Sequence, residues 1–299
     1  MNIVGSRFLD PALLAKLPNL EIAAKKLVKG TFVGYHKSPD FGYSVEFVDH
    51  REYAAGDDLR TVDWRVWARK DKYYVKRFEM ESQLKATIVL DGSKSMDFGE
   101  GKLKKIEYGS YLAATLAYTL IHQNDMAGLV TFDSKVRHYL PPRGSRQHLR
   151  MMLHILGQLQ PGPATNIPAV CHHLAETIKT RGMIILISDL LDDTDKILTA
   201  LQHFQHKKHD VIVFHLLDDA ELNLPYAELA NFRELETSSR LAVDPATFRA
   251  TYQDRVRAYC TSLREGCLKS NVDYHLIRTS QPIETVLSNY FAFRARRTR

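Results

Sequence analysis

The sequence lacks several features that would place it in a common class of protein. It has no apolar run long enough to cross a bilayer, and residues 1–7 show no apolar core of a signal peptide. Only three cysteines occur among its 299 residues, without the spacing of a zinc site. These absences point away from a zinc module, and they predict a cytoplasmic protein with no transmembrane segment.

Glycine-rich loops are also missing at the place where chemistry is expected. A phosphate-binding loop needs several glycines, and the most distinctive stretch of the chain offers only Gly92. A nucleophile elbow needs a second glycine after its serine, and none follows Ser95 at that position. Neither of these two enzyme motifs is therefore predicted.

Positive charge is in modest excess. The formal net charge is +6, and it is dispersed except at the basic end of the chain, residues 294–299. Such an end can contact nucleic acid or anionic lipid, but no nucleic-acid-binding motif accompanies it. We interpret it as a solvated terminus and expect no specific nucleic-acid partner.

The prediction of a site is built on residues 86–96. The apolar, partly β-branched run 86–90 ends in Asp91, as is typical of a buried parallel strand. Ser93 and Ser95 follow it. Chemistry in open α/β sheets gathers at the carboxyl ends of strands, and a carboxylate with two hydroxyls suits Mg²⁺ or Mn²⁺. A plain turn capped by serines fits these residues equally well.

Four regions follow from the pattern along the chain. Residues 1–30 have helical spacing, and residues 31–85 hold both tryptophans and short β-like pieces, which predicts a small β-rich extension. Residues 86–294 alternate between strand and helix patterns. They predict an α/β domain of Rossmann type, a doubly wound, mostly parallel sheet covered on both faces. Residues 295–299 form the basic tail.

Three local boundaries are predicted as well. We expect an edge strand over residues 136–140 that is stopped by Pro141 and Pro142. The last helix is expected over residues 283–294. Asp218 and Asp219 follow another strand on the same rim, and we interpret them as a turn, with a helix cap or a supporting role at the site left open.

A second aspartate strengthens the metal hypothesis. Asp189 ends the apolar strand 183–188, so in a parallel sheet it lies on the same rim as Asp91. Thr165 belongs to a loop that begins on that side of the sheet. Five oxygen ligands are therefore expected to converge: Asp91, Ser93, Ser95, Thr165 and Asp189.

This set resembles the metal-ion-dependent adhesion site of von Willebrand factor A domains. The resemblance implies that Ser93, Ser95 and Thr165 lie closest to Mg²⁺, that the aspartates act through water, and that a partner's carboxylate completes the octahedron. Because its nearest ligands are neutral, the cation attracts an external anion. Such a site can stay without metal until the partner binds.

A further set of motifs points to one particular family. These motifs are Gly42-Tyr43-Ser44-Val45-Glu46-Phe47, Arg51-Glu52-Tyr53, Gly56-Asp57-Asp58-Leu59-Arg60, Asp63-Trp64 and Ala68-Arg69. Over roughly residues 30–290 the chain resembles the bacterial "domain of unknown function fifty-eight" family, whose genes typically lie beside those of MoxR-type AAA+ ATPases. The resemblance implies a non-enzymatic adaptor or co-chaperone that works with such an ATPase on an unidentified client.

The segment that contains Gly56, Asp57, Asp58, Arg60, Asp63, Trp64 and Arg69 has three interpretations. Its acids and arginines are able to form a structural network of ion pairs, which we favour. They could instead form a surface for a partner, or a catalytic pair of carboxylates. A carboxylate pair would need a pocket, which the sequence does not define.

Other hypotheses stay open beside the adaptor. Asp91 or Asp189 could orient a metal-bound water in an Mg²⁺-dependent hydrolase, although no general base stands out. The chain could also be a scaffold whose site no longer binds metal. Lys94 would weaken cation binding if it pointed inward. We interpret His206 and His209 as a solvated helix end, because the lysines between them repel a metal ion.

Overall fold

The computed structural model describes most of the chain beyond its first 44 residues. The described residues are 45–57, 60, 62–70, 72–80, 83–162, 165–226, 230–233, 240–243 and 245–297. The helical segment expected over residues 1–30 lies outside them. By its contacts the chain divides into a small unit, Thr31–Gln83, and a sheet unit, Met1–Gly30 with Leu84–Arg299.

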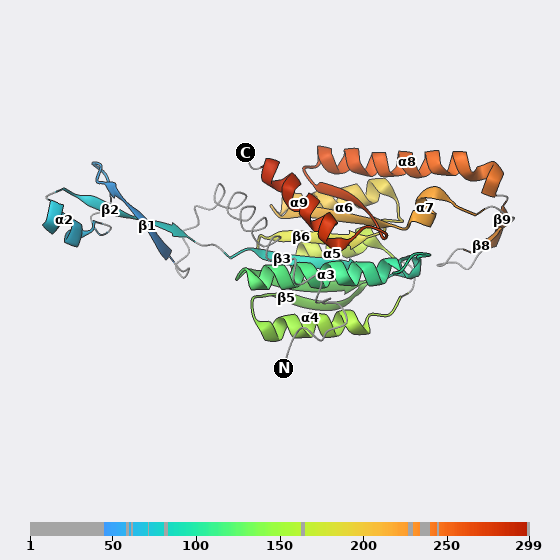
Figure 1. Ribbon diagram of the computed structural model, residues 1–299, viewed down its shortest axis with the longest axis horizontal. Helices are drawn as coiled ribbons and strands as arrows, with labels where there is room; N and C mark the ends of the chain where they lie inside the picture. Colours follow the sequence, from blue (N-terminus) through green and yellow to red (C-terminus); the bar gives the residue numbers. More distant parts are fainter. Residues whose placement is uncertain are drawn as a thin grey trace. The chain divides into compact units, whose positions relative to one another are not determined.

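The sheet unit is built on six strands in the order β10-β7-β6-β3-β4-β5 (Figure 1). They are β3 (Lys85–Asp91), β4 (Met126–Phe132), β5 (Val136–Arg143), β6 (Met183–Ser188), β7 (Asp210–Leu217) and β10 (Asp273–Arg278). All neighbouring pairs are parallel except β4 with β5, which is antiparallel. This sheet confirms the predicted doubly wound, mostly parallel fold.

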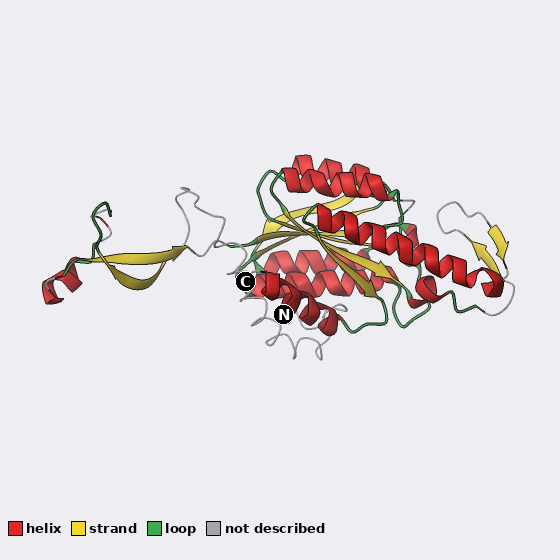
Figure 2. Cartoon of the chain, turned by 90° about the horizontal axis from the view of Figure 1, so that it is seen from above, coloured by secondary structure: helices red, strands yellow, loops and turns green. Residues whose placement is uncertain are grey.

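Helices cover both faces of this sheet (Figure 2). The first face carries α3 (Lys105–His122), α4 (Arg146–Gln158) and α9 (Ile283–Arg297), and the second carries α5 (Ile167–Thr177), α6 (Thr194–His206) and α8 (Pro245–Lys269). Val89, Leu186 and Val213 belong to the core under the second group. The intervening strand residues face α3, and Gly109 allows a close approach: a Cβ there would lie 2.9 Å from Leu90 Cδ1.

Shorter elements complete the described chain. In the small unit, β1 (Val45–Glu52) pairs antiparallel with β2 (Tyr74–Met80), and α2 (Trp64–Lys70) lies between them in sequence. In the sheet unit, η3 (Lys94–Asp97) follows β3, and α7 (Asp219–Asn223) follows β7. Two short strands, β8 (Ala230–Arg233) and β9 (Arg240–Val243), form a hairpin before α8. None of the helices in the described ranges combines the length and apolar character of a membrane span.

Two predicted boundaries are wrong. The prolines do not stop β5, which continues to Arg143. As an edge strand it tolerates residues without an N–H, and Gly128 on β4 leaves room, since a Cβ there would lie 2.9 Å from Pro142 N. The last helix continues past Arg294, whose side chain is buried rather than solvated.

Arg294 belongs to the core of the sheet unit. Its Nη1 donates to Asp273 Oδ2 at 2.5 Å, and its Nη2 donates to Asp210. Asp273 begins β10 and Asp210 begins β7, so one guanidinium joins the starts of two neighbouring strands. The basic run at the chain end therefore has a structural member that composition alone does not distinguish.

Candidate functional site

Asp91 stands at the carboxyl end of β3 and is fully buried. Its Oδ1 accepts a hydrogen bond from Ser93 N at 2.9 Å, and its Oδ2 accepts one from Ser188 Oγ at 2.7 Å. Ser188 is the last residue of the neighbouring strand β6, which runs parallel to β3. The carboxylate is thus fixed by donors from its own loop and from the next strand.

Ser93 and Ser95 present their hydroxyls side by side. Both side chains are buried, and Ser93 Oγ lies 3.0 Å from Ser95 Oγ. The short helix η3 begins between them, and this turn brings residues two apart in sequence to the same side. Lys94 is exposed, so the cation that lies between the serines in sequence does not enter the site.

The loop that carries Thr165 lies against the serine loop. Gly162 N donates to Gly92 O at 2.7 Å, and Asn166 N donates to Asp133 O at 3.4 Å. Asn166 then caps α5 through its side chain, which accepts from Ala169 N at 3.1 Å. The Thr165 hydroxyl oxygen is buried. These bonds bring the third hydroxyl loop to the rim where β3 ends.

Asp189 is also fully buried, directly after β6. Burial first, and then the negative charge of Asp189, raise the pKa of Asp91 to about 7. The negative charges of the two carboxylates therefore repel each other across the ends of adjacent strands, as the topology predicts.

Lys105 is a buried residue of the rim that the sequence analysis missed. It is the first residue of α3 and is fully buried, with its Nζ 2.8 Å from Asp189 Oδ2 and 2.5 Å from Glu221 Oε1. Burial lowers the pKa of Lys105, but the charges of Asp189 and Glu221 outweigh it and raise the pKa. The ammonium therefore stays protonated and neutralises one of the two rim aspartates.

His215 forms a hydrogen bond with the backbone of Asp189 on the rim. Its Nε2 is 2.9 Å from the carbonyl oxygen of Asp189, so this nitrogen carries the proton. Its Nδ1 then accepts from the Tyr274 hydroxyl at 2.6 Å. Burial lowers the pKa of His215 to about 4, which keeps the ring neutral and the tautomer fixed.

The donor set fits a small, hard cation. Octahedral Mg²⁺ has ligands at about 2.0–2.1 Å, so neighbouring ligand oxygens are about 3.0 Å apart. The two serine oxygens, which form a hydrogen bond with each other, have this separation. Three carboxylates, those of Asp91, Asp189 and Glu221, face the single ammonium of Lys105, so a divalent cation would offset an excess of negative charge.

His209 and Asp218 differ from their interpretation in the sequence analysis. His209 is buried, with Nδ1 3.3 Å from Gly182 N and Nε2 3.3 Å from Ile178 O, so the interpretation as a solvated helix end is wrong for this residue. Within the described part of the chain, no three His, Cys, Asp or Glu side chains group as metal ligands. Asp218 is a helix cap rather than a turn residue, and its side chain accepts from Ala220 N at 3.0 Å.

Two acids of the small unit, Asp57 and Asp63, have structural contacts. Asp57 accepts two hydrogen bonds from Arg51 Nη2, at 2.7 and 2.8 Å, next to Gly56, which has a φ of +108°. Asp63 Oδ1 accepts from Arg65 N at 3.0 Å at the start of α2, and its Oδ2 lies 2.9 Å from His50 Nε2. Both acids therefore fix local backbone.

The remaining polar and aromatic members of this motif are exposed or lie outside the described residues. Arg60, Trp64 and Arg69 are exposed, and Asp58 lies outside the described residues. Trp64 packs edge-on against Trp67, with ring centroids 6.2 Å apart, and Trp67 stacks on Tyr73 at 6.0 Å. The segment thus combines structural acids with an exposed aromatic cluster, Trp64, Trp67 and Tyr73.

Known proteins similar to this chain were found by sequence and by structure. The chain is 27% identical over 244 residues to the uncharacterized proteins Mb1516 of Mycobacterium bovis and Rv1480 of Mycobacterium tuberculosis, covering 79% of this chain and 76% of each relative. Among solved structures, BatB from Bacteroides thetaiotaomicron is 16% identical with a TM-score of 0.48, covering 71% of this chain and 98% of BatB. The VWA domain of SpRpn10 is 13% identical with a TM-score of 0.39, covering 69% and 95%.

A family profile matches most of the chain. The match covers residues 49–261 and therefore includes parts of both units. It contains Asp91, both serines, Thr165 and Asp189, together with the acids of the small unit. This confirms the family resemblance seen in the sequence motifs, and the chain belongs to the family described as "Protein of unknown function DUF58".

Proposed function

We propose that this protein is a metal-dependent protein-interaction module. Mg²⁺, or Mn²⁺ in its place, would be held by Asp91, Ser93, Ser95, Thr165 and Asp189. The observation that carries the proposal is the pair of buried serine hydroxyls, 3.0 Å apart beside a fixed carboxylate. The bound cation would supply an electrophilic point for a carboxylate of a partner protein.

The contacts of the two aspartates favour binding over hydrolysis. Both oxygens of Asp91 accept hydrogen bonds from the protein, and Asp189 pairs with the Lys105 ammonium. A general base must have an oxygen available to accept a proton from water, and all four oxygens of these two carboxylates already accept hydrogen bonds from protein groups. We therefore propose an adaptor and not an enzyme.

The partner is proposed from the family resemblance. It is a MoxR-type AAA+ ATPase, for which this protein would act as an adaptor or co-chaperone toward a client. The three cysteines, Cys171, Cys260 and Cys267, are free and buried, which supports a role in a reducing cytoplasm. Metal would make the contact conditional, because binding would need both the cation and an acidic group on the partner.

The proposal is tested by affinity capture from a native lysate, with Mg²⁺ or EDTA, using wild type and Ser93→Ala as bait. Ser134→Ala is the matched control, because it removes a hydroxyl at the end of the neighbouring strand β4 without changing the donor set. Wild type and Ser134→Ala are expected to retain the ATPase only with Mg²⁺. Retention in every lane would support the partner and contradict the metal mechanism. A lysate that yields no ATPase in any lane contradicts the partnership.

Metal binding itself is tested by thermal unfolding. A ligand that binds only the folded state stabilises it by about 2.7 kcal/mol when present at about one hundred times its dissociation constant. Saturating Mg²⁺ is therefore expected to raise the melting temperature of wild type and of Ser134→Ala, but not of Ser93→Ala. Equal shifts in all three proteins would show that Mg²⁺ binds elsewhere.

A further inference from the structure

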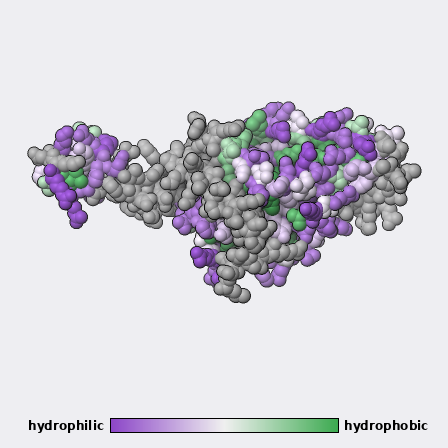
Figure 3. All heavy atoms as spheres, in the orientation of Figure 1, coloured by the Kyte–Doolittle hydropathy of each residue, from purple (hydrophilic) through white to green (hydrophobic). Residues whose placement is uncertain are grey.

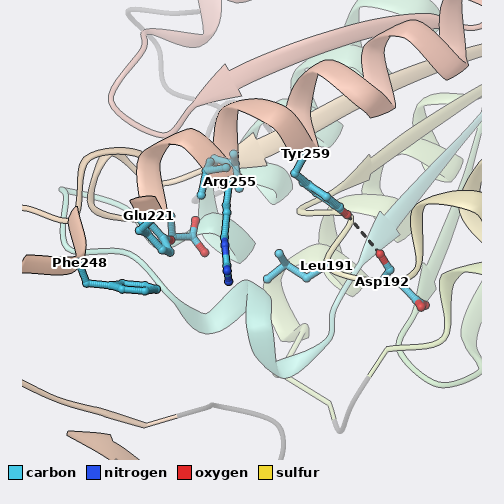
Figure 4. A pocket seen from close by; sticks show the side chains of 9 residues that line it. Leu191, Asp192, Glu221, Phe248, Arg255 and Tyr259 are labelled. Atoms are coloured by element: carbon cyan, nitrogen blue, oxygen red, sulfur yellow. Dashed lines mark hydrogen bonds between the residues drawn. The ribbon is translucent and has the colours of Figure 1, made fainter. Parts of the chain in front are cut away.

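A cleft of about 620 Å³ opens beside the candidate metal site (Figure 4). One wall is the loop after β6, with Leu191 and Asp192, and a second is Glu221 on α7. Helix α8 supplies the third wall, including Phe248, Arg255 and Tyr259. The volume is within the range of sites that receive one or more side chains of a ligand.

Two contacts connect the cleft to the metal rim. Leu191 is two residues beyond Asp189, and the Tyr259 hydroxyl on α8 donates to Leu190 O and also lies 3.3 Å from Asp192 O. Glu221 lines the cleft and also receives the Lys105 ammonium that binds Asp189. A peptide that reaches the rim therefore meets this cleft next.

The cleft has an apolar interior and a free cation. Leu191 is 49% exposed and Phe248 is 39% exposed, and both project into the same space (Figure 4). Arg255 extends between them, and among the described residues it forms no ion pair. Glu221 is engaged by Lys105, while the Asp192 side chain points away from Arg255 and accepts from Asp193 N at 2.7 Å.

We propose that this cleft is the specificity pocket for the partner segment, which would be an acidic peptide with an aromatic or long aliphatic side chain. This inference rests on the proposed function, because one carboxylate of the segment binds the metal. The apolar side chain enters between Leu191 and Phe248, and a second carboxylate pairs with Arg255. Guanidinium groups bind carboxylates in a two-pronged geometry, so Arg255 selects for this second acid.

The charges favour this occupant over a basic or neutral one. A bound divalent cation would offset the excess of negative charge that Asp91, Asp189 and Glu221 have over Lys105, and Arg255 then offers the cleft a positive charge that forms no ion pair among the described residues. Burial of a large side chain against the apolar surface between the rim and Arg255 is favourable. Buried aromatic anchors dominate the energetics of many interfaces.

The test is a selection from a displayed library of random peptides on immobilised full-length protein in Mg²⁺. Enriched peptides are then made with a fluorescent label, and their affinity is measured by anisotropy. We expect an apolar residue flanked by Asp or Glu, with binding weakened about tenfold by Arg255→Glu and by Phe248→Ala. The matched control is Arg257→Glu, an exposed position on the same helix whose side chain pairs with Asp254 outside the cleft.

The outcomes separate this inference from the proposed function. Binding that is lost in EDTA and in Ser93→Ala, but unchanged by Arg255→Glu and Phe248→Ala, overturns the cleft and keeps the metal module. Binding that needs Arg255 and Phe248 but survives EDTA supports the cleft and contradicts the metal mechanism. A selection that enriches no acidic–apolar peptides also overturns the cleft. Thermal unfolding of each variant confirms that the fold is retained.

Discussion

The two units of this protein use charged and aromatic side chains in opposite ways. In the sheet unit, Lys105, Asp189 and Arg294 are buried and paired. In the small unit, Trp64 is 53% and Tyr73 is 50% exposed. A large core can enclose ion pairs, and it fixes them in one geometry at a desolvation cost. A small unit encloses less of its surface, and Trp64 and Tyr73 remain exposed.

Hydrophilic residues are visible on both units in Figure 3, so the contrast lies in what each unit buries. Many hydrophilic residues cover the face of the sheet unit seen in Figure 3. Within the small unit, by contrast, the buried apolar residues of the described part are Val62 and Val75, joined by a β-bridge. The sheet unit is thus stabilised from within, whereas the small unit depends on a few contacts and on surface pairs such as Arg51–Asp57.

The largest expected effect comes from removing the buried cation of the sheet unit. Lys105→Met keeps the length of the side chain but leaves Asp189 and Glu221 as buried carboxylates without their partner. The free energy of unfolding is expected to fall by about 3–5 kcal/mol, the usual cost of breaking a buried ion pair. Chemical denaturation followed by far-ultraviolet circular dichroism measures this loss.

The adjacent lysine is the control for this variant. Lys104 pairs with Asp97 at 2.8 Å, but both side chains are substantially exposed. Lys104→Met is expected to lower stability far less than Lys105→Met, because water and salt screen an exposed pair. Similar losses in the two variants would contradict the distinction between buried and surface charge.

The next effect tests whether the two units unfold separately. Leu129 lies in the middle of β4 and is fully buried, so Leu129→Ala is expected to cost about 2–5 kcal/mol. Both tryptophans of the chain, Trp64 and Trp67, belong to the small unit. Tryptophan fluorescence should therefore keep its unfolding midpoint in Leu129→Ala while the circular dichroism midpoint falls.

Val75→Ala supplies the converse experiment. This residue is buried in the small unit, so the substitution is expected to shift the fluorescence midpoint and leave the circular dichroism midpoint nearly unchanged. If either variant moved both midpoints together, the units would unfold as one cooperative structure. That result would contradict separate stabilisation of the two units.

The smallest effect concerns the surface pair of the small unit. The hydrogen bond from Ala54 N, and then that from Arg51, lower the pKa of Asp57 below its usual value. An acid whose pKa is lowered on folding contributes stability above its unfolded pKa of about 4, and the contribution disappears as the pH falls through the folded value. Asp57→Asn should therefore reduce the fluorescence midpoint slightly at neutral pH. Toward lower pH the variant and wild type should converge, and a constant difference would contradict the assignment.

Local sequence patterns predicted much of the fold and part of the site. Short β-branched runs ending in Asp91 and Asp189 are local signals, and parallel pairing of β3 with β6 then places both ends on one rim. Ser93 and Ser95 are close to Asp91 in the chain, so their convergence needs only a turn. These features could be predicted because each depends on neighbours in sequence or on the general geometry of parallel sheets.

The missed features depend on pairings between distant residues. Lys105 lies 84 positions from Asp189 and 116 from Glu221, and a single lysine at a helix start carries no signal for either contact. Arg294 occurs within a basic run, and its partners begin two strands far from it in sequence. The cleft at Arg255 requires three separate segments to meet, so no periodicity reveals it.

His215 gives this buried rim a built-in spectroscopic probe. The imidazole has a single proton, at Nε2, and its two nitrogens are fixed by the carbonyl of Asp189 and the hydroxyl of Tyr274. The charges of Asp189 and Lys105 both act on the ring. Its two nitrogen-15 resonances should therefore respond to events at the rim while the protein titrates with cation or peptide. Selective histidine labelling would make those events visible from a residue that is fully buried.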